Sequence, residues 1–165
     1  MILAFILILS MSCESNKATS SEPEITNSET IAPSKPSADL TYTEEFMQLV
    51  NNHRASLGLN ALILNDEISQ IVQDHSDAMA SGSVAFGHSG FSTRCTDSRS
   101  ALGGGNLCAE NVAMGQKNAQ AAFTSWMNSS GHKANIEQAR ATHTGFGYQK
   151  SSGGTYYWTH IFIER

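Results

Sequence analysis

The order of the predicted secondary structure, helices first and strands last, constrains the fold of this chain more than any other feature. Apolar residues recur at helical spacing over residues 42–57 and 66–81, and a third helix is predicted from about Asn118. Residues 155–164 are rich in aromatic and β-branched residues and are predicted to pair with residues 144–150 as an antiparallel hairpin. Helices followed by strands indicate an α+β domain in which helices pack on a small sheet.

Polar residues and glycines mark the ends of the first two predicted helices. Thr41 and Glu44 have the spacing of a capping box, and Gly58 follows the last apolar residue of the first helix. Asp66 is predicted to cap the second helix, and Gly82 is predicted to end it. The first two helices are therefore expected to have well-defined boundaries.

Two segments carry no sustained helical or strand pattern. Residues 59–65 are predicted to be a short connection, and residues 83–108, which are rich in Gly and Ser, are predicted to be a long loop. A loop of that length in a compact domain is usually functional or held by a cross-link. Residues 110–113 are expected to form a short buried segment, and residues 132–138 a short helical turn.

The N-terminal residues predict export. An apolar run at residues 2–9 is followed by small or weakly polar residues and then by Cys13, which is typical of a lipoprotein-type signal peptide over residues 1–13. The run is too short to span a bilayer, which takes about 20 residues. An ordinary signal peptide that is cut elsewhere, or a frayed N-terminus, would also fit. A lipidated Cys13 would anchor the mature protein to a membrane of the cell envelope, outside the cytoplasm.

Residues 14–41 are predicted to be a disordered tether. All three prolines of the chain fall in this stretch, among Ser, Thr, Glu, Lys and Asn residues. Such a composition buries too little apolar surface to offset the entropy lost on ordering. The folded domain is therefore expected over residues 42–165.

The cysteines indicate the cellular compartment, and the net charge limits the class of partner. If Cys13 carries lipid, Cys95 and Cys108 remain as an even pair in an oxidising compartment and would form a disulfide; two free thiols are the alternative. The formal net charge is −5 and the sequence has no basic cluster, which argues against nucleic acid as a partner.

Two of the six histidines stand apart from the others. His88 and His132 each follow a glycine in a turn-like segment, and Glu110 lies between them in an otherwise apolar stretch. A carboxylate in such a setting is costly unless it is paired or binds a metal. Two imidazoles and a carboxylate suit a divalent transition metal, and the same three groups could instead form an acid/base site.

For the other four histidines, the sequence gives less indication of a functional role. His53 and His75 lie on the apolar stripes of the first two helices, where a hydrogen-bonded structural role is the simpler interpretation. The sequence does not decide which face of its strand His160 occupies, and His143 is equally ambiguous.

Six short motifs resemble the CAP superfamily, which takes in cysteine-rich secretory proteins, antigen 5 and plant pathogenesis-related 1 proteins. The exported bacterial members are the most similar. The motifs occur in family order and at normal spacing over about residues 42–165. They are VNNHRASLGL at 50–59, FGHS at 86–89, ENVA at 110–113, NSSGHKANI at 128–136, GFGY at 145–148 and YWTHIF at 157–162.

The resemblance implies an α-β-α sandwich with a central antiparallel sheet and a large cleft lined by two histidines and two acidic residues. The matching motifs place His88 and His132 as the histidines and Glu110 as one of the acids. The second acid is missing, because Ser129 or a neighbour occupies its place. This departure weakens any mechanism that needs two carboxylates.

Three functions remain open at this point, because members of the family are reported to bind sterols and other lipids, to bind divalent metals and, in a few cases, to cleave proteins. The first is a binding module for a lipid, sterol or glycan-like ligand or a protein partner, with Zn²⁺ or another divalent cation at His88, Glu110 and His132. The second is a metal-dependent hydrolase that uses the same three residues as catalytic groups, with Glu110 as the base. The third is a structural protein of the cell envelope.

Overall fold

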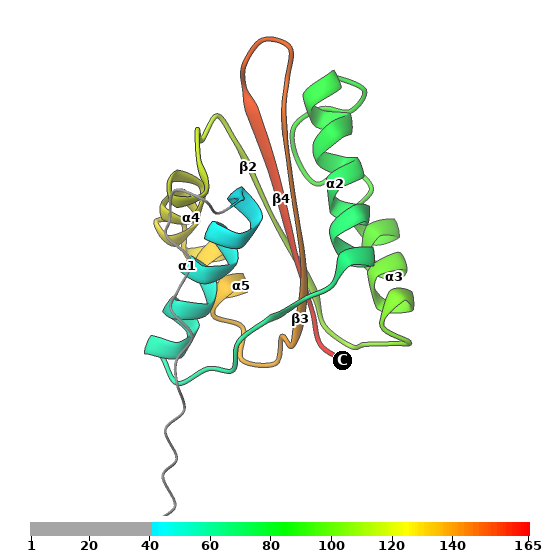
Figure 1. The fold of residues 1–165 in the computed structure, drawn as a ribbon. Coiled ribbons are helices and arrows are strands. Elements are labelled where there is room, and N and C mark those ends of the chain that lie inside the picture. Colours follow the sequence, from blue (N-terminus) through cyan, green and yellow to red (C-terminus); the bar gives the residue numbers. More distant parts are fainter. Residues whose placement is uncertain (1–40) are drawn as a thin grey trace, which may run out of the picture. The chain divides into compact units, whose positions relative to one another are not determined.

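The computed structural model describes residues 41–165, which fold around a four-stranded sheet of order β1-β3-β4-β2 (Figure 1). The central strand β4 (Tyr156–Ile163) pairs antiparallel with β3 (His143–Lys150) on one side and with β2 (Cys108–Met114) on the other. The two-residue strand β1 (Ile63–Leu64) adds to β3 in parallel. The predicted C-terminal hairpin is therefore confirmed, and β2 is left as an edge strand.

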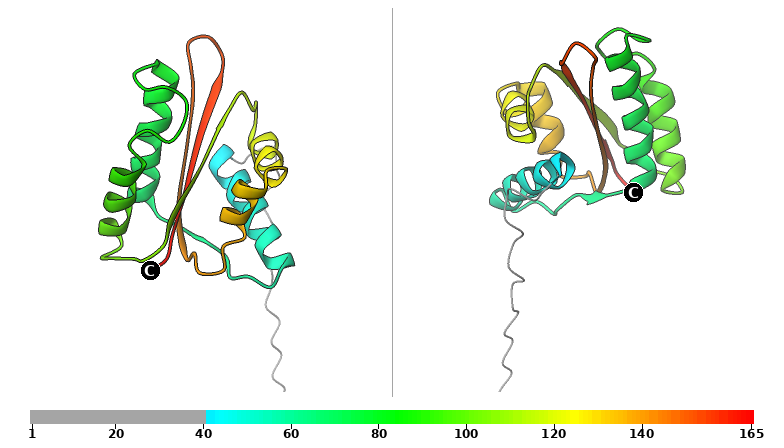
Figure 2. Two further views of the ribbon diagram at one scale, coloured as in Figure 1. Left: turned by 180° about the vertical axis from the view of Figure 1, so that it is seen from behind. Right: turned by 45° about the horizontal axis from the view of Figure 1, so that its top comes forward.

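Helices cover both faces of this sheet, as the two additional views in Figure 2 show. On one face lie α1 (Tyr42–Ser56), α4 (Ala119–Met127) and α5 (Ser130–Ile136). On the other face lie α2 (Asp66–Ser81) and α3 (Phe91–Ala101). The predicted α-β-α sandwich is confirmed.

The helix caps agree with the sequence, with one shift. The Thr41–Glu44 capping box is formed, and Gly82 ends α2 in the left-handed conformation at φ 78°. The N-cap of α2 is Asn65 rather than Asp66, because the Asn65 side chain accepts a hydrogen bond from the Ile68 amide at 2.9 Å. Asp66 instead begins the first turn, where a carboxylate favours the positive end of the helix dipole.

Strand alternation divides the core between the two faces. Towards α1, α4 and α5 the core is strongly aromatic: Phe46, Trp126, Phe146, Trp158 and Phe162. Towards α2 and α3 it is smaller and aliphatic: Ile68, Val72, Leu102, Ile161 and Ile163. We call these the aromatic face and the α2/α3 face.

Two glycines let α2 lie directly on β3. A Cβ atom at Gly145 would lie 2.5 Å from the Ile68 backbone, and one at Gly147 would lie 2.6 Å from the Gln73 backbone nitrogen. No side chain fits at these distances. The glycines of this strand therefore serve close packing between a helix and the sheet.

The prediction of one long loop over residues 83–108 is wrong, because the helix α3 occupies the middle of this segment. The buried residues of α3 are Arg94, Cys95 and Ser98, so this helix has no apolar stripe from which a helical period can be recognised. The short strand β1 was also missed, within the predicted connection 59–65. Both elements are held by contacts from distant parts of the chain.

The predicted disulfide is present: Cys95 of α3 is bonded to Cys108 of β2, with the two Cα atoms 5.9 Å apart. The predicted signal peptide, the lipidation site Cys13 and the tether up to residue 40 lie outside the described residues. Among residues 41–165, no helix combines the length and the apolar character needed to cross a membrane.

Candidate functional site

Glu110 lies at the centre of the candidate site, on the α2/α3 face of β2. Its side chain is 1% exposed, and Arg94 of α3 holds it at two points. The Arg94 Nε atom donates to Glu110 Oε2 at 2.7 Å and Nη2 donates to Oε1 at 2.8 Å. Such a two-point pair satisfies a buried carboxylate and fixes its orientation.

His88 makes the third contact with this carboxylate. Its Nδ1 atom lies 2.9 Å from Glu110 Oε1, and its side chain is 50% exposed. An ionised carboxylate only accepts hydrogen bonds, so His88 Nδ1 is protonated and donates to Glu110. The Nε2 atom of His88 is therefore the ring nitrogen that does not contact Glu110.

His132 approaches from the opposite face, on α5 rather than on a turn. The next residue of β2, Asn111, points to this face and donates from Nδ2 to the His132 carbonyl at 3.0 Å. Asn135 donates to Asn111 Oδ1 at 2.8 Å, which fixes the amide. Because β2 is an edge strand, groups from both faces of the sheet can meet beside it.

The two imidazoles are close enough to influence each other. Burial lowers the pKa of His132, and the His88 ring, when it is charged, lowers this pKa further. His132 is therefore kept neutral, which is the form that ligates metals. We refer to His88, Arg94, Glu110 and His132 together as the His88 cluster.

His75 of α2 supports the loop that carries His88. Its Nε2 atom lies 2.9 Å from the Gly87 carbonyl, and burial lowers its pKa. The neutral ring therefore donates to this carbonyl. The predicted hydrogen-bonded structural role of His75 is confirmed.

The cluster fits a divalent cation only in part. Two imidazole nitrogens are suitable donors for Zn²⁺. Both Glu110 oxygens are taken by Arg94 and His88, however, and residues 41–165 hold no group of three or more His, Cys, Asp or Glu side chains placed to bind a metal. The assignment of His88, Glu110 and His132 as metal ligands stays a prediction, with Glu110 placed behind His88.

Arg94 is the site residue that the sequence analysis missed. Its charge lies in a Gly- and Ser-rich segment with no period, so nothing local marks it as buried. The disulfide was the available signal. Arg94 precedes Cys95, and Glu110 follows Cys108 by two positions, so a bond between the two cysteines brings the arginine and the carboxylate together.

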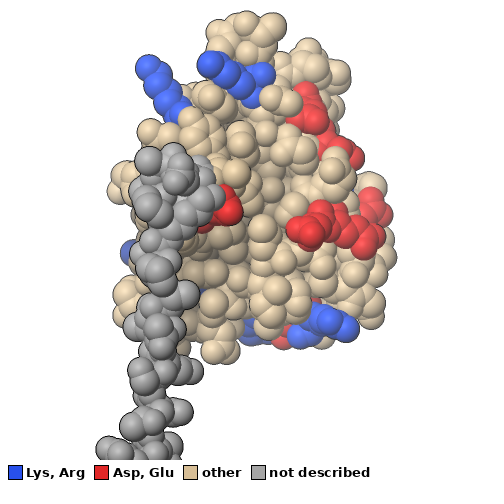
Figure 3. Space-filling view, in the orientation of Figure 1, with Lys and Arg blue, Asp and Glu red and all other residues tan. Residues whose placement is uncertain are grey.

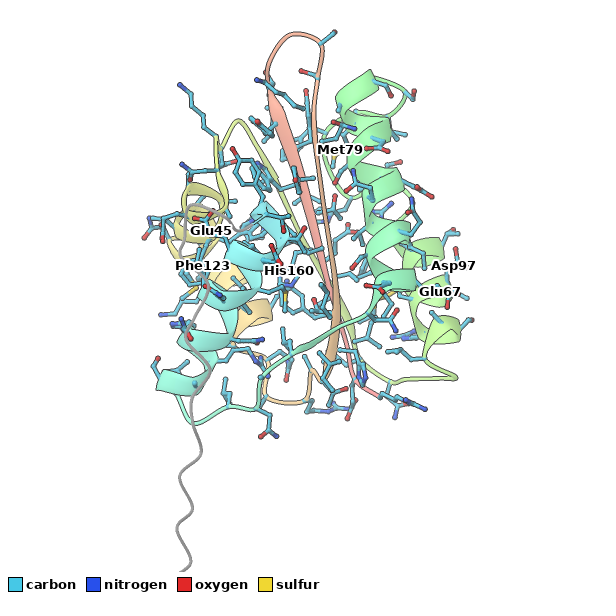
Figure 4. All side chains as sticks on the ribbon, viewed as in Figure 1. Glu45, Glu67, Met79, Asp97, Phe123 and His160 are labelled. Atoms are coloured by element: carbon cyan, nitrogen blue, oxygen red, sulfur yellow. A yellow bond between two sulfur atoms is a disulfide. The ribbon has the colours of Figure 1, made fainter. Side chains whose placement is uncertain are left out.

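The remaining histidines lie outside the cluster. His53 Nε2 lies 2.8 Å from Glu137 Oε1, which confirms a hydrogen-bonded structural role, and His143 Nδ1 lies 2.9 Å from the Thr142 hydroxyl. His160 belongs to the aromatic face, between α1 and the sheet (Figure 4). It is fully buried, and neither ring nitrogen has a hydrogen-bond partner among residues 41–165. Burial lowers the pKa of His160 to about 3.

Charge is distributed unevenly over the view of Figure 3, where acidic side chains gather over α2 and α3. Four acidic residues lie on α2: Asp66, Glu67, Asp74 and Asp77. Figure 4 places Glu67 and Asp97 on the outer side of these helices. The outer side of α2 and α3 is therefore acidic in this view.

A family comparison agrees with this fold and with the motifs. The sequence profile of the cysteine-rich secretory protein family, CAP, matches residues 47–162. The chain belongs to the CAP family. The match includes every residue of the His88 cluster.

Individual relatives extend the comparison. This CAP protein is 33% identical over 143 residues to the uncharacterized protein YkwD of Bacillus subtilis, covering 86% of this chain and 53% of YkwD. It therefore spans about half the length of that relative.

Solved structures show the same fold. An extracellular SCP-domain protein of Bacillus anthracis aligns with a TM-score of 0.61 at 24% identity, over 73% of this chain and 39% of that one. An outer surface protein of Borrelia burgdorferi aligns with a TM-score of 0.59 at 20% identity, over 74% and 95% of the two chains. At these identities the likeness concerns the fold.

Proposed function

We propose that this CAP protein is a binding module of the bacterial cell envelope, outside the cytoplasm, that holds a divalent cation such as Zn²⁺ between His88 and His132. A lipid at Cys13 would anchor it to the membrane. The ligand would be an apolar or glycan-like molecule, or a protein partner, seated beside the cation. The hydrogen bond from His88 Nδ1 to Glu110 Oε1 carries the proposal, because it leaves His88 Nε2 available as a ligand.

The chemistry of the cluster supports this cation site. Metal-binding histidines commonly donate their second ring N–H to a carboxylate, which sets the tautomer and the ring orientation. Glu110 has that relation to His88, and Arg94 holds Glu110 in place. The bound cation would supply a positive charge and open coordination positions for a polar group of the ligand.

The same contacts favour binding over hydrolysis. A hydrolase using this site needs a carboxylate that takes a proton from an attacking water. Both oxygens of Glu110 already accept hydrogen bonds, three in all, from Arg94 and His88. Glu110 is the one carboxylate among the contacts that residues 41–165 make with His88 and His132.

Calorimetry with Zn²⁺ tests the proposal. We expect the wild-type chain to bind one ion and the variant His88→Ala/His132→Ala to lose that binding. His143→Ala is the matched control, since His143 lies on β3 and contacts Thr142 rather than the cluster. Equal affinity in all three proteins would refute the cation site.

A second test separates binding from hydrolysis. Glu110→Gln should weaken cation binding, because the amide no longer provides the carboxylate for Arg94 and His88. The wild-type protein supplied with Zn²⁺ should leave a panel of protein and ester substrates intact. Turnover that Glu110→Gln abolishes would show instead that the cluster is catalytic.

A further inference from the structure

The helix that supplies Arg94 makes few apolar contacts with the rest of the domain along its middle. The buried residues of α3 are Arg94, Cys95 and Ser98, and the Ser98 hydroxyl has no hydrogen-bond partner among residues 41–165. Apolar packing comes mainly from its two ends, at Phe91 and at Ala101 and Leu102. The middle of α3 is therefore held by the disulfide and by the Arg94–Glu110 pair.

These two attachments are adjacent in both elements that they join. Arg94 and Cys95 are consecutive in α3, while Cys108 and Glu110 are two positions apart and so point to the same face of β2. The covalent bond thus fixes the distance over which the guanidinium reaches the carboxylate.

The same helix is tied to the loop that carries His88. Arg94 Nη1 donates to the Ser89 carbonyl at 2.7 Å, and the Phe91 amide donates to the His88 carbonyl at 3.0 Å. Arg94 therefore contacts both Glu110 and the loop, and a shift of α3 would move both.

We propose that Arg94 and the Cys95–Cys108 disulfide are the positioning groups of the cation site, holding Glu110 so that His88 presents Nε2 rather than Nδ1 to the ion. The proposal rests on the proposed function for the identity of the ion. Its structural part, the tautomer of His88, is independent of any metal. Arg94 acts through Glu110 and does not touch the ion.

Two variants test this in the full-length chain. Arg94→Lys keeps the positive charge but removes the two-point pair, because an ammonium lacks the planar fork of a guanidinium. Cys95→Ser/Cys108→Ser removes the covalent bond and leaves Arg94 unchanged. Arg99→Lys is the control, since Arg99 lies on the same helix and its guanidinium donates to the Asn106 carbonyl, outside the cluster.

The first measurement is the imidazole tautomer, read from long-range ¹H–¹⁵N spectra without metal. Wild type and Arg99→Lys should show His88 protonated at Nδ1, and both test variants should show a mixture of tautomers. The second measurement is the Kd for Zn²⁺ by calorimetry. Removing a partner of a ligand typically weakens metal binding about 10–100-fold, and we expect a loss in that range for both test variants.

Each outcome decides the matter. A wild-type tautomer together with a Zn²⁺ affinity within about two-fold of wild type would overturn the role of whichever group was changed. Unfolding of the whole domain in Cys95→Ser/Cys108→Ser, seen as loss of the β3 and β4 amide signals, would also overturn it, because the disulfide would then support the fold and not the site. If wild type binds no Zn²⁺, the proposed function fails while the tautomer spectra still judge the positioning.

Discussion

The two faces of the sheet are held together by different forces. On the aromatic face, Phe46 stacks on Phe146 with ring centroids 4.1 Å apart and meets Trp126 edge-on at 5.3 Å, all within one continuous apolar core. On the α2/α3 face, α3 is fastened to β2 by a disulfide and a buried ion pair. The aromatic face therefore holds the larger apolar core, and the α2/α3 face combines a smaller apolar core with a polar site.

The largest expected effect compares one phenylalanine from each face. Phe46→Ala should lower the free energy of unfolding by about 3–5 kcal/mol, because Phe46 is fully buried and its loss leaves a cavity. Phe91→Ala, at the half-buried start of α3, should cost about 1 kcal/mol. Urea unfolding of both variants measures this. Equal losses of unfolding free energy in the two variants would contradict a larger contribution of the aromatic face to stability.

Low pH should destabilise the folded protein mainly through His160, which lies on the aromatic face. Its pKa is lowered to about 3 by burial and then by the charge of Arg54, so the folded state keeps it neutral while the unfolded chain protonates it near pH 6.5. The unfolded state binds more protons between these values, and stability falls as the pH falls. The loss due to His160 between pH 7 and pH 4 should be about 3 kcal/mol.

The variant His160→Phe isolates this contribution. Phenylalanine fills the same aromatic surroundings and has no ionisable nitrogen. Urea unfolding at pH 7 and at pH 4 should show a smaller pH-dependent loss in His160→Phe than in wild type. The same loss in both proteins would place the acid sensitivity elsewhere.

Removing the disulfide should have a smaller and more local effect. The cysteines are 13 positions apart, and closing a loop of about that length stabilises by up to about 3 kcal/mol. In Cys95→Ser/Cys108→Ser, hydrogen exchange should speed up in α3 and remain slow in β3 and β4. A uniform increase across the sheet would show that the α2/α3 face supports the whole domain.

The smallest effect compares two buried serines of the α2/α3 face. The Ser98 hydroxyl has no partner among residues 41–165, whereas Ser76 Oγ lies 2.8 Å from the Thr159 hydroxyl and donates to the Gly147 carbonyl at 3.2 Å. Ser98→Ala should be neutral or stabilise by up to about 1 kcal/mol, and Ser76→Ala should cost about 1 kcal/mol. Thermal unfolding of the pair measures the difference. A larger cost for Ser98→Ala would reveal an interaction of that hydroxyl.

The same division explains how far the sequence predicts the fold. The stripe of α2, from Ile68 through Val72 to Met79, is apolar and periodic, and its helix was predicted almost to the residue. For α1, the apolar stripe predicted the buried residues less accurately. Leu57 is exposed, and Arg54 is fully buried because its guanidinium donates to four backbone carbonyls, one at the nearby Asn60 and three in the distant segment 136–141.

Contacts between distant parts of the chain also limit how much of the candidate site the sequence predicts. Glu110 stood out because a lone carboxylate in an apolar stretch needs a partner, and the family motifs singled out His88 and His132. That the partner is Arg94 depends on α3, whose helical character is hidden because its buried side is polar. The sequence shows which groups need a partner, but which partner they receive depends on the fold.

Titration of the full chain with Zn²⁺, followed in long-range ¹H–¹⁵N spectra of its histidines, tests whether His88 and His132 together hold one cation. We expect the signals of His88 Nε2 and the His132 ring to shift together and saturate at one ion. His88 Nδ1 should keep its proton, and the signals of His53, His75, His143 and His160 should stay in place. Shifts spread over those other histidines, or none at His88 and His132, would contradict it.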